Sequence, residues 1–244
     1  IDHHKSSGDF IKELETIPNV KAIWRKAASC PRLMIETLKP SVNPYERFLI
    51  DVADICEGGE SRNADVGKVA DMIKLAIARD PGDLNFMTYL VRAMLEGKEL
   101  STDPEIVSRA KIAKFLLQRL LKLMSERSIE VRGTKIVSLN LPESRVYAGL
   151  LGIATTEFAR ITRKDVVLIR REEGKVVVTV RTLNDKAYRV CKALAERVSG
   201  KFGGHAEAAS ATLPDMELKD AVKVVSEVVR DVSKEIRERR MRTS

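Results

Sequence analysis

The chain has 244 residues, of which 44% are apolar and 32% are charged, so it is long enough for two medium domains with hydrophobic cores. It contains no run of about 18 apolar residues and no charged-then-apolar leader, which argues against a membrane span and a secretory signal. Its cysteines, Cys30, Cys56 and Cys191, are far apart and form no regular framework, so we expect small apolar fillers in a reduced, cytoplasmic setting.

The net charge is divided unequally along the chain. Residues 1–130 carry 20 basic and 20 acidic side chains, whereas residues 131–244 carry 23 and 15, so the whole net charge of +8 lies in the C-terminal half. This asymmetry favours an anionic partner for that half, and nucleic acid or a nucleotide fits better than a membrane surface.

The first motif is Asp2-His3-His4, which uses two of the three histidines in the chain. It places a carboxylate and two imidazoles side by side, a common layout for metal ligands. The alternative is an expression tag or a frayed terminus.

Helices are predicted over residues 27–38, 44–55, 65–78 and 85–95 by apolar periodicity between breaks, with Ser29 able to cap the first and a short strand expected before it at 20–24. The helix at 44–55 is almost continuously apolar, but Asp51 and Asp54 interrupt it. A buried carboxylate is costly unless it is paired or binds a metal, so at least one of these two needs such a partner.

A long helix is predicted from Pro104 to about Ser128, and its length suits a strut between two domains. The pattern then changes to a mixed α/β order around a small sheet. Strands are expected at 135–140, 165–170, 175–182 and 211–213, and helices at 143–160, 185–198 and 215–240.

A glycine-rich stretch from Gly200 to Ser210 interrupts this order. Gly203 and Gly204 let backbone N–H groups crowd around an anion, and His205 adds a donor, so we interpret the stretch as a phosphate-holding loop. The alternative is a helix C-cap glycine followed by a tight turn.

Together, Asp-His-His at residues 2–4 and Gly-Gly-His-x-x-Ala-Ala at residues 203–209 resemble the DHH/DHHA1 phosphoesterases, the superfamily of the RecJ nucleases. The resemblance covers essentially the whole chain. It implies an α/β protein of two domains: the mostly helical C-terminal part of a DHH domain at 1–103, a connecting helix at 104–130, and a mixed α/β DHHA1 domain at 131–244. The N-terminal part of the DHH domain, with its Asp-x-Asp ligands, is expected to be missing, so fragment 1–244 alone should be close to inactive.

The same resemblance implies roles for individual residues in the first domain. His3 would bind Mn²⁺ or Mg²⁺, and Asp54, in a matching Val-Ala-Asp context, would be a second ligand. His4 would face the scissile phosphate and Asp2 would orient the cluster. Such ligands hold divalent ions that generate hydroxide and neutralise a phosphodiester.

In the second domain the resemblance implies a substrate site. His205, Gly203 and Gly204 would bind a phosphate or a nucleotide end, and Arg181 would contact the substrate backbone. Phe202 stands where related proteins often have glycine. It would either stack on a base or fill the core.

The resemblance therefore implies a RecJ-like, metal-dependent exonuclease or phosphodiesterase acting on single-stranded DNA or RNA. Short oligonucleotides and long strands both remain open as substrates. The alternative is a catalytically inactive, RecJ-like replisome component that binds GINS, MCM and single-stranded DNA.

Overall fold

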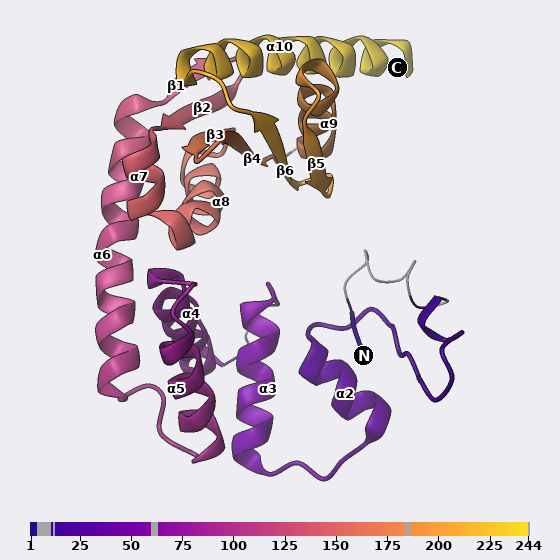
Figure 1. Ribbon diagram of the computed structural model, residues 1–244, viewed down its shortest axis with the longest axis vertical. Coiled ribbons are helices and arrows are strands. Elements are labelled where there is room, and N and C mark those ends of the chain that lie inside the picture. Colours follow the sequence, from indigo (N-terminus) through magenta and orange to yellow (C-terminus); the bar gives the residue numbers. More distant parts are fainter. Residues whose placement is uncertain (4–10, 12, 60–62, 184–185, 244) are drawn as a thin grey trace. The chain divides into compact units, whose positions relative to one another are not determined.

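The structure is a computed structural model that describes residues 1–3, 11, 13–59, 63–183 and 186–243, except for the side chains of 239, 240, 242 and 243. His4 therefore lies outside the described residues. Two compact units are present, Ile1–Ile112 and Ala113–Ser244 (Figure 1). Helix α6 (Pro104–Arg127) contributes residues to both.

The described helices of the N-terminal unit are α2 (Cys30–Leu38), α3 (Pro44–Cys56), α4 (Ala64–Arg79), α5 (Leu84–Leu95) and the start of α6. These agree with the predicted helices, because the sequence supplies their N-caps, except that α2 begins at Cys30, three residues later than predicted. Ser29 accepts a hydrogen bond from the Arg32 backbone N–H, and Asn43 forms a capping box with Glu46. The strand predicted at 20–24 is wrong, because the described residues form only one bridge there, between Asp2 and Trp24.

Apolar residues on facing sides of α3, α4, α5 and α6 form the core of this unit. Its fully buried members include Ala70, Ala76, Ala93 and Ile106. No described helix is long and apolar enough to cross a lipid bilayer.

The C-terminal unit is built on a six-stranded sheet of order β1-β2-β3-β4-β6-β5. Its strands are β1 (Ile129–Val131), β2 (Thr134–Leu139), β3 (Asp165–Glu172), β4 (Lys175–Arg181), β5 (Lys201–Gly204) and β6 (Ala208–Pro214). Strands β2 and β3 pair in parallel and the other neighbours are antiparallel. The predicted class, a mixed α/β domain following a mostly helical one, is confirmed.

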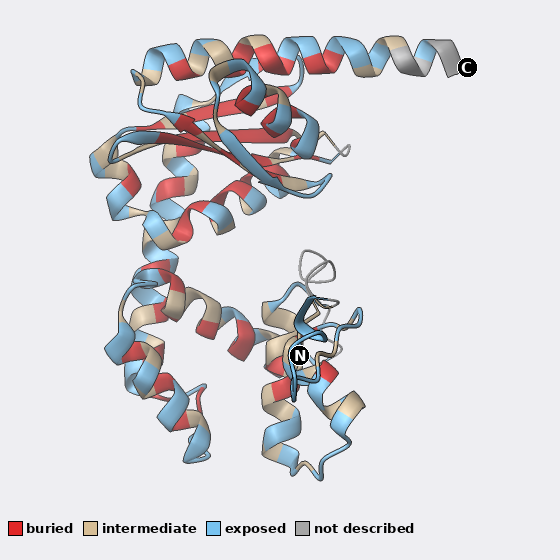
Figure 2. Ribbon diagram, turned by 45° about the vertical axis from the view of Figure 1, so that its right-hand side comes forward, coloured by how far each residue is buried: buried red, intermediate tan, exposed pale blue. Residues whose placement is uncertain are grey.

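Helices cover both faces of the sheet. Helices α7 (Leu141–Val146) and α8 (Leu151–Thr162) pack on one face, while α9 (Ala187–Val198) and α10 (Leu218–Thr243) pack on the other (Figure 1). Figure 2 shows buried residues concentrated on the strands and on the inner sides of these helices. The second face has a continuous apolar core in which Val176, Val178 and Val180 of β4 meet α9 and α10.

Three expectations for this unit are corrected. The single helix predicted at 143–160 is broken at Tyr147 into α7, a 3₁₀ turn at Ala148–Leu150 and α8, consistent with the low helix propensity of Gly149. Strand β1 (Ile129–Val131), which directly follows α6, was not predicted. The stretch expected to be a loop, 200–210, contains β5 and the start of β6 joined by a turn.

Candidate functional site

The first described residues lie along the loop that precedes α2. The backbone N–H of Asp2 donates to the carbonyl of Ile23 at 3.0 Å, and a carboxylate oxygen of Asp2 accepts from the backbone N–H of His3 at 2.7 Å. The first bond fixes the start of the Asp-His-His motif against a segment more than twenty residues away in the sequence.

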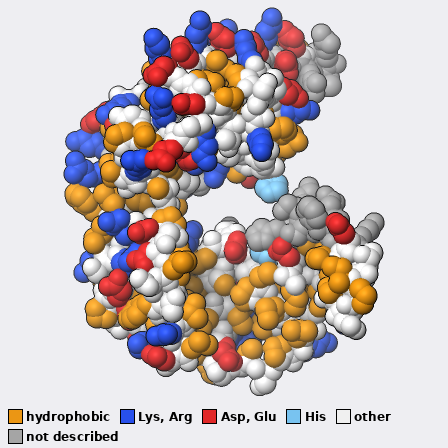
Figure 3. All heavy atoms as spheres, viewed as in Figure 1, with side chains coloured by type: hydrophobic (Ala, Val, Ile, Leu, Met, Phe, Trp, Pro, Cys, Tyr) orange, Lys and Arg blue, Asp and Glu red, His pale blue; other side chains and the backbone are white. Residues whose placement is uncertain are grey.

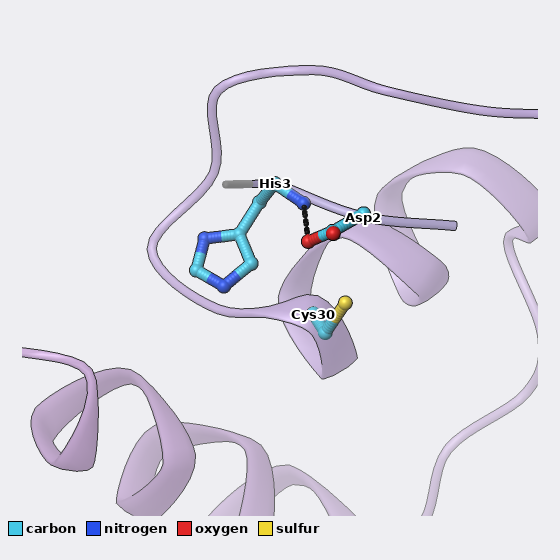
Figure 4. A group of neighbouring side chains, drawn as sticks. All are labelled: Asp2, His3 and Cys30. Carbon is cyan, nitrogen blue, oxygen red and sulfur yellow. Dashed lines mark hydrogen bonds between the residues drawn. The ribbon is translucent and has the colours of Figure 1, made fainter. Parts of the chain in front are cut away.

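Cys30, the first residue of α2, lies beside this segment (Figure 4). One ligand atom each of Asp2, His3 and Cys30 lies within 4.8 Å of the other two, and all three residues are partly exposed. Among the described residues this is the group of potential ligands that could hold a metal ion. The sequence predicts Asp2 and His3 as part of a metal site but indicates only a small apolar filler at Cys30.

The ring of His3 is oriented by the backbone. Its Nδ1 lies 3.2 Å from the carbonyl oxygen of Ala27. Because a carbonyl only accepts, this bond requires a proton on Nδ1, and Nε2 is then the nitrogen that can offer a lone pair to a cation. Metal-binding histidines in proteins are commonly held in this way.

Asp54 lies on α3 and is held by α2. One carboxylate oxygen accepts from Ser29 Oγ at 2.6 Å, and the other accepts from Arg32 Nε at 2.9 Å and Nη2 at 2.6 Å. The same Nη2 reaches Asp51 at 2.6 Å. Hydrogen bonding to Asp54 is the main cause that raises the pKa of Arg32, with burial opposing it. Arg32 is thus a partner of the kind predicted for at least one of these carboxylates, and it bonds both.

The role of Asp54 as a metal ligand stays a prediction. Asp54 is tied to Ser29, next to Cys30, but it is not a member of the Asp2, His3 and Cys30 cluster. To bind a cation, Asp54 would have to release at least part of its contact with the guanidinium, since two positive charges beside one carboxylate repel each other.

In the C-terminal unit, Arg181 ends strand β4 on the α8 face of the sheet. Its Nε donates to Thr156 Oγ1 at 3.1 Å, and its Nη1 donates to the carbonyl of Val180 at 3.1 Å. Burial lowers the pKa of Arg181. Within the described part of the chain no carboxylate is bonded to it, so this guanidinium keeps its capacity for an anion.

The β5–β6 hairpin places the glycines beside Arg181 in the sheet. Gly204 pairs with Ala209, and Arg181 pairs with Ala208 across the other edge of β6. The backbone N–H of His205 donates to the carbonyl of Ala208 at 2.8 Å, which closes the turn. The structure therefore brings Arg181, Gly204 and His205 to one end of the sheet.

The two glycines differ in what surrounds them. A Cβ on Gly204, whose φ is +130°, would lie 2.5 Å from both the Ala208 carbonyl oxygen and the Ala209 Cα, whereas a Cβ on Gly203 would meet nothing within 4 Å. Gly204 is therefore required by the hairpin itself. Gly203 leaves open space on an exposed strand where a ligand could approach the backbone.

Phe202 is separated from Arg181 by the sheet. It pairs with Ala211, which faces the α9 core, and its ring meets Tyr188 of α9 edge to face with centroids 5.3 Å apart. Phe202 is 38% exposed and Tyr188 is 42% exposed, so Phe202 does not fill the core. No sequence pattern singled out Tyr188, because the pair joins two elements.

Charges of both signs cover this unit. Figure 3 shows Lys and Arg side chains interspersed with Asp and Glu on its visible surface. Many exposed arginines are paired, for example Arg160 with Glu157 at 2.6 Å and Arg197 with Glu227 at 2.9 Å. The net charge of the C-terminal half therefore indicates a binding surface less directly than the position of Arg181, to which no described carboxylate is bonded.

Comparison with known proteins identifies the C-terminal unit at the sequence level. The family described as the DHHA1 domain matches residues 133–231. No curated protein matches the chain.

Solved structures show a similar fold over most of the chain. The pGpG-specific phosphodiesterase PggH from Vibrio cholerae aligns with a TM-score of 0.61 at 15% identity, covering 89% of this chain and 78% of PggH. RecJ from Thermus thermophilus, in complex with Mg²⁺, aligns with a TM-score of 0.54 at 18% identity, covering 87% of this chain and 39% of RecJ. The complex of the same RecJ with Mn²⁺ aligns with a TM-score of 0.50 at 20% identity, covering 81% of this chain and 35% of that one. The chain thus spans well under half of the Thermus thermophilus RecJ.

Proposed function

We propose a function from the premise that this chain is a RecJ-like member of the DHH/DHHA1 superfamily, with residues 133–231 as its DHHA1 domain. On this premise it is part of a divalent-metal-dependent phosphodiesterase that cleaves single-stranded DNA or RNA. The observation that supports hydrolysis is the gathering of Asp2 and His3 with a third potential ligand within 4.8 Å. Carboxylate and imidazole are suitable donors for divalent ions that act on phosphodiesters.

In this proposal the N-terminal unit holds the cation. The Nε2 atom of His3 and the carboxylate of Asp2 are the donors, and the carbonyl of Ala27 keeps the imidazole in position. When bound there, a cation would neutralise charge on the phosphoryl oxygens and would make water a better nucleophile. Asp54 and His4 remain the predicted further ligand and the predicted contact to the scissile phosphate.

The C-terminal unit would hold the substrate. Arg181 would bind a phosphate with a charge-assisted hydrogen bond, and the exposed backbone at Gly203, with Gly204 and His205 at the turn, would approach a neighbouring phosphate. Phe202 and Tyr188, on the opposite face of the sheet, would instead offer a base a stacking surface if the strand passes over that face. These contacts recognise backbone and base faces, so they fit single strands of many sequences.

Substrate length divides this proposal into two forms. The likeness to RecJ supports an exonuclease on longer strands, whereas the likeness to PggH, of which the chain covers 78%, supports a short substrate such as a dinucleotide. Both forms use the same Arg181 contact and differ in how many nucleotides are bound.

A second candidate function is binding of single-stranded nucleic acid without hydrolysis. The observation that favours it is the guanidinium of Arg32, which already neutralises Asp54 through bonds of 2.6 and 2.9 Å. A side chain in that place reduces the need for a metal ion beside Asp54.

The experiment is a cleavage assay of the full-length protein with Mn²⁺ or Mg²⁺. A 5′-labelled single strand of about 20 nucleotides and a labelled dinucleotide are supplied separately, and product release is followed for the wild type, His3→Ala and Lys68→Ala. Lys68 is 76% exposed and pairs with the exposed Asp65, so Lys68→Ala is the matched surface control.

Hydrolysis that is abolished by His3→Ala and retained by Lys68→Ala supports the enzyme, and the preferred substrate selects its form. No hydrolysis of either substrate, with binding of the single strand retained, supports the second candidate. Hydrolysis at the wild-type rate by His3→Ala would overturn the proposed site.

A further inference from the structure

Cys30 introduces a donor of a different kind beside Asp2 and His3. The residues expected to bind metal offered oxygen and nitrogen, but the thiol of Cys30 lies within the same 4.8 Å group. Sulfur is a soft ligand, and it changes which ions a site prefers.

The position of the thiol is fixed by the way α2 begins. Ser29 caps the helix, so Cys30 is held in the first turn, and Cys30 Sγ lies 3.4 Å from the carbonyl oxygen of Ile1. This contact places the thiol against the segment that carries Asp2 and His3 (Figure 4). The start of a helix is also favourable for the negative charge of a metal-bound thiolate.

The three donors can meet one cation with little movement. Bond lengths of about 2.0–2.3 Å to zinc place tetrahedral ligand atoms about 3.5 Å apart. The observed limit of 4.8 Å is larger by an amount that rotation of partly exposed side chains can close. Three protein ligands leave one position of a tetrahedral ion open, as in catalytic rather than structural zinc sites.

We propose that Asp2, His3 and Cys30 form a three-ligand site for a borderline divalent cation, Zn²⁺ being the best fit, and that Cys30 makes this site discriminate against Mg²⁺. The inference rests on the proposed function only in identifying this cluster as a metal position. Mg²⁺ prefers oxygen ligands and octahedral geometry, whereas a set of one oxygen, one nitrogen and one sulfur matches Zn²⁺ and Co²⁺.

Cobalt titration tests this directly, because a cysteine thiolate bound to Co²⁺ gives a charge-transfer absorption band that oxygen and nitrogen ligands do not give. The full chain, stripped of metal and kept reduced, is titrated with Co²⁺ and then with competing Zn²⁺ or Mg²⁺. The wild type is compared with Cys30→Ser and with Cys56→Ser, whose partly exposed thiol on α3 makes it the matched control.

We expect one equivalent of Co²⁺ to give the band in the wild type and in Cys56→Ser, and Zn²⁺ to displace it while equimolar Mg²⁺ does not. Cys30→Ser should lose the band and bind Zn²⁺ at least tenfold more weakly. No band in the wild type, a band that persists in Cys30→Ser, or displacement by Mg²⁺ as readily as by Zn²⁺ would overturn the proposal.

Alkylation of the wild type gives a readout that does not depend on folding of a variant. Zn²⁺ should slow iodoacetamide labelling of Cys30, mapped by mass spectrometry, and should leave the labelling of Cys56 unchanged. Cys191 serves as an internal zero, because burial raises the pKa of its thiol to about 12, although nearby Arg181 opposes the shift. Equal labelling of Cys30 with and without Zn²⁺ counts against the site.

These outcomes are separable from those of the proposed function. A cobalt–thiolate band in a protein that cleaves neither substrate supports the site and removes the hydrolase. Cleavage with Mn²⁺ at equal rates by the wild type and Cys30→Ser, with no band in the wild type, supports the hydrolase and removes the thiolate site.

Discussion

The two candidate regions are held together by different forces. Around His3 and Asp54 the contacts between separate segments depend on side chains: the His3 ring bonds the carbonyl of Ala27, and Arg32 of α2 bonds Asp54 of α3. Around Arg181 and Gly204 the positions are set by backbone hydrogen bonds of neighbouring strands. One side-chain change can therefore rearrange the first region, whereas the second should change only when its backbone is disturbed.

We expect the strongest effect from the backbone of the second region. Gly204→Ala places a Cβ at 2.5 Å from two backbone atoms at a φ of +130°. We expect a loss of about 3 kcal/mol in the free energy of unfolding, because neither the strained φ nor the clash with main chain can relax easily. Urea denaturation followed by circular dichroism measures it.

Gly203→Ala is the matched control, because its Cβ would meet nothing within 4 Å. Its free energy of unfolding should stay within about 0.5 kcal/mol of the wild type. If this variant nevertheless binds a single strand more weakly, a ligand approaches the backbone at Gly203. Equal losses of stability in both variants would contradict the geometry of the hairpin.

The second-largest effect is expected from Arg32→Met, which tests the side-chain contacts of the first region. Arg32→Met removes the cation shared by Asp51 and Asp54, whose side chains are 47% and 16% exposed, and leaves two adjacent carboxylates without it. We expect a loss of about 2 kcal/mol in the free energy of unfolding, between the values typical of buried and exposed pairs. Denaturation in parallel with Lys68→Met, which breaks an exposed pair, provides the comparison.

Divalent ions should change this result if Asp54 binds metal. Mn²⁺ would then restore part of the stability lost in Arg32→Met, since the cation replaces the guanidinium beside Asp54. An Arg32→Met variant as stable as Lys68→Met would show that the pair is a surface contact of little weight.

The contrast also explains how far the sequence could be interpreted. Helices with their own caps, such as α2 behind Ser29, and strands β3 and β4, predicted at 165–170 and 175–182, follow from local signals, and the predictions there are confirmed. Strand β5 could not be predicted, because Lys201-Phe202-Gly203-Gly204 has no apolar alternation and exists only by pairing with β6.

Side-chain partners were beyond the sequence for a related reason. Cys30 meets Asp2 across 28 positions, and Arg32 meets Asp54 across 22. Neither spacing follows from the period of a helix or a strand. The sequence did indicate that at least one of Asp51 and Asp54 needed a partner, but a metal and an arginine satisfy that need equally well.

A moderate effect is expected from Arg181, which lies where the second region would meet phosphate. Arg181→Gln should weaken binding of a labelled single strand about tenfold and reduce the salt dependence by about one charge, with the fold unchanged. Fluorescence anisotropy in EDTA measures binding without cleavage. Arg160→Gln is the control, because Arg160 is neutralised by Glu157 at 2.6 Å. Equal effects of the two substitutions would mean that Arg181 has no special role.

His205→Ala should weaken the same binding about two- to fivefold and leave stability unchanged, since the turn uses the backbone N–H of His205 rather than its exposed ring. Anisotropy and urea denaturation on the same preparation separate the two effects. Unchanged affinity would reduce the hairpin turn to a structural role.

Phe202→Leu should have the smallest effect on binding, and it tests which face of the sheet contacts the ligand. Phe202 lies on the α9 face, whereas Gly203 and Arg181 lie on the α8 face, so Phe202→Leu should change single-strand binding less than about twofold if the ligand lies on the α8 face. Loss of the edge-to-face contact with Tyr188 should still cost about 1 kcal/mol of stability. If Phe202→Leu weakens binding more than Arg181→Gln does, aromatic stacking contributes more to binding than the phosphate contact. Bases then stack on the Phe202–Tyr188 pair, and the binding surface of this unit lies on the α9 face.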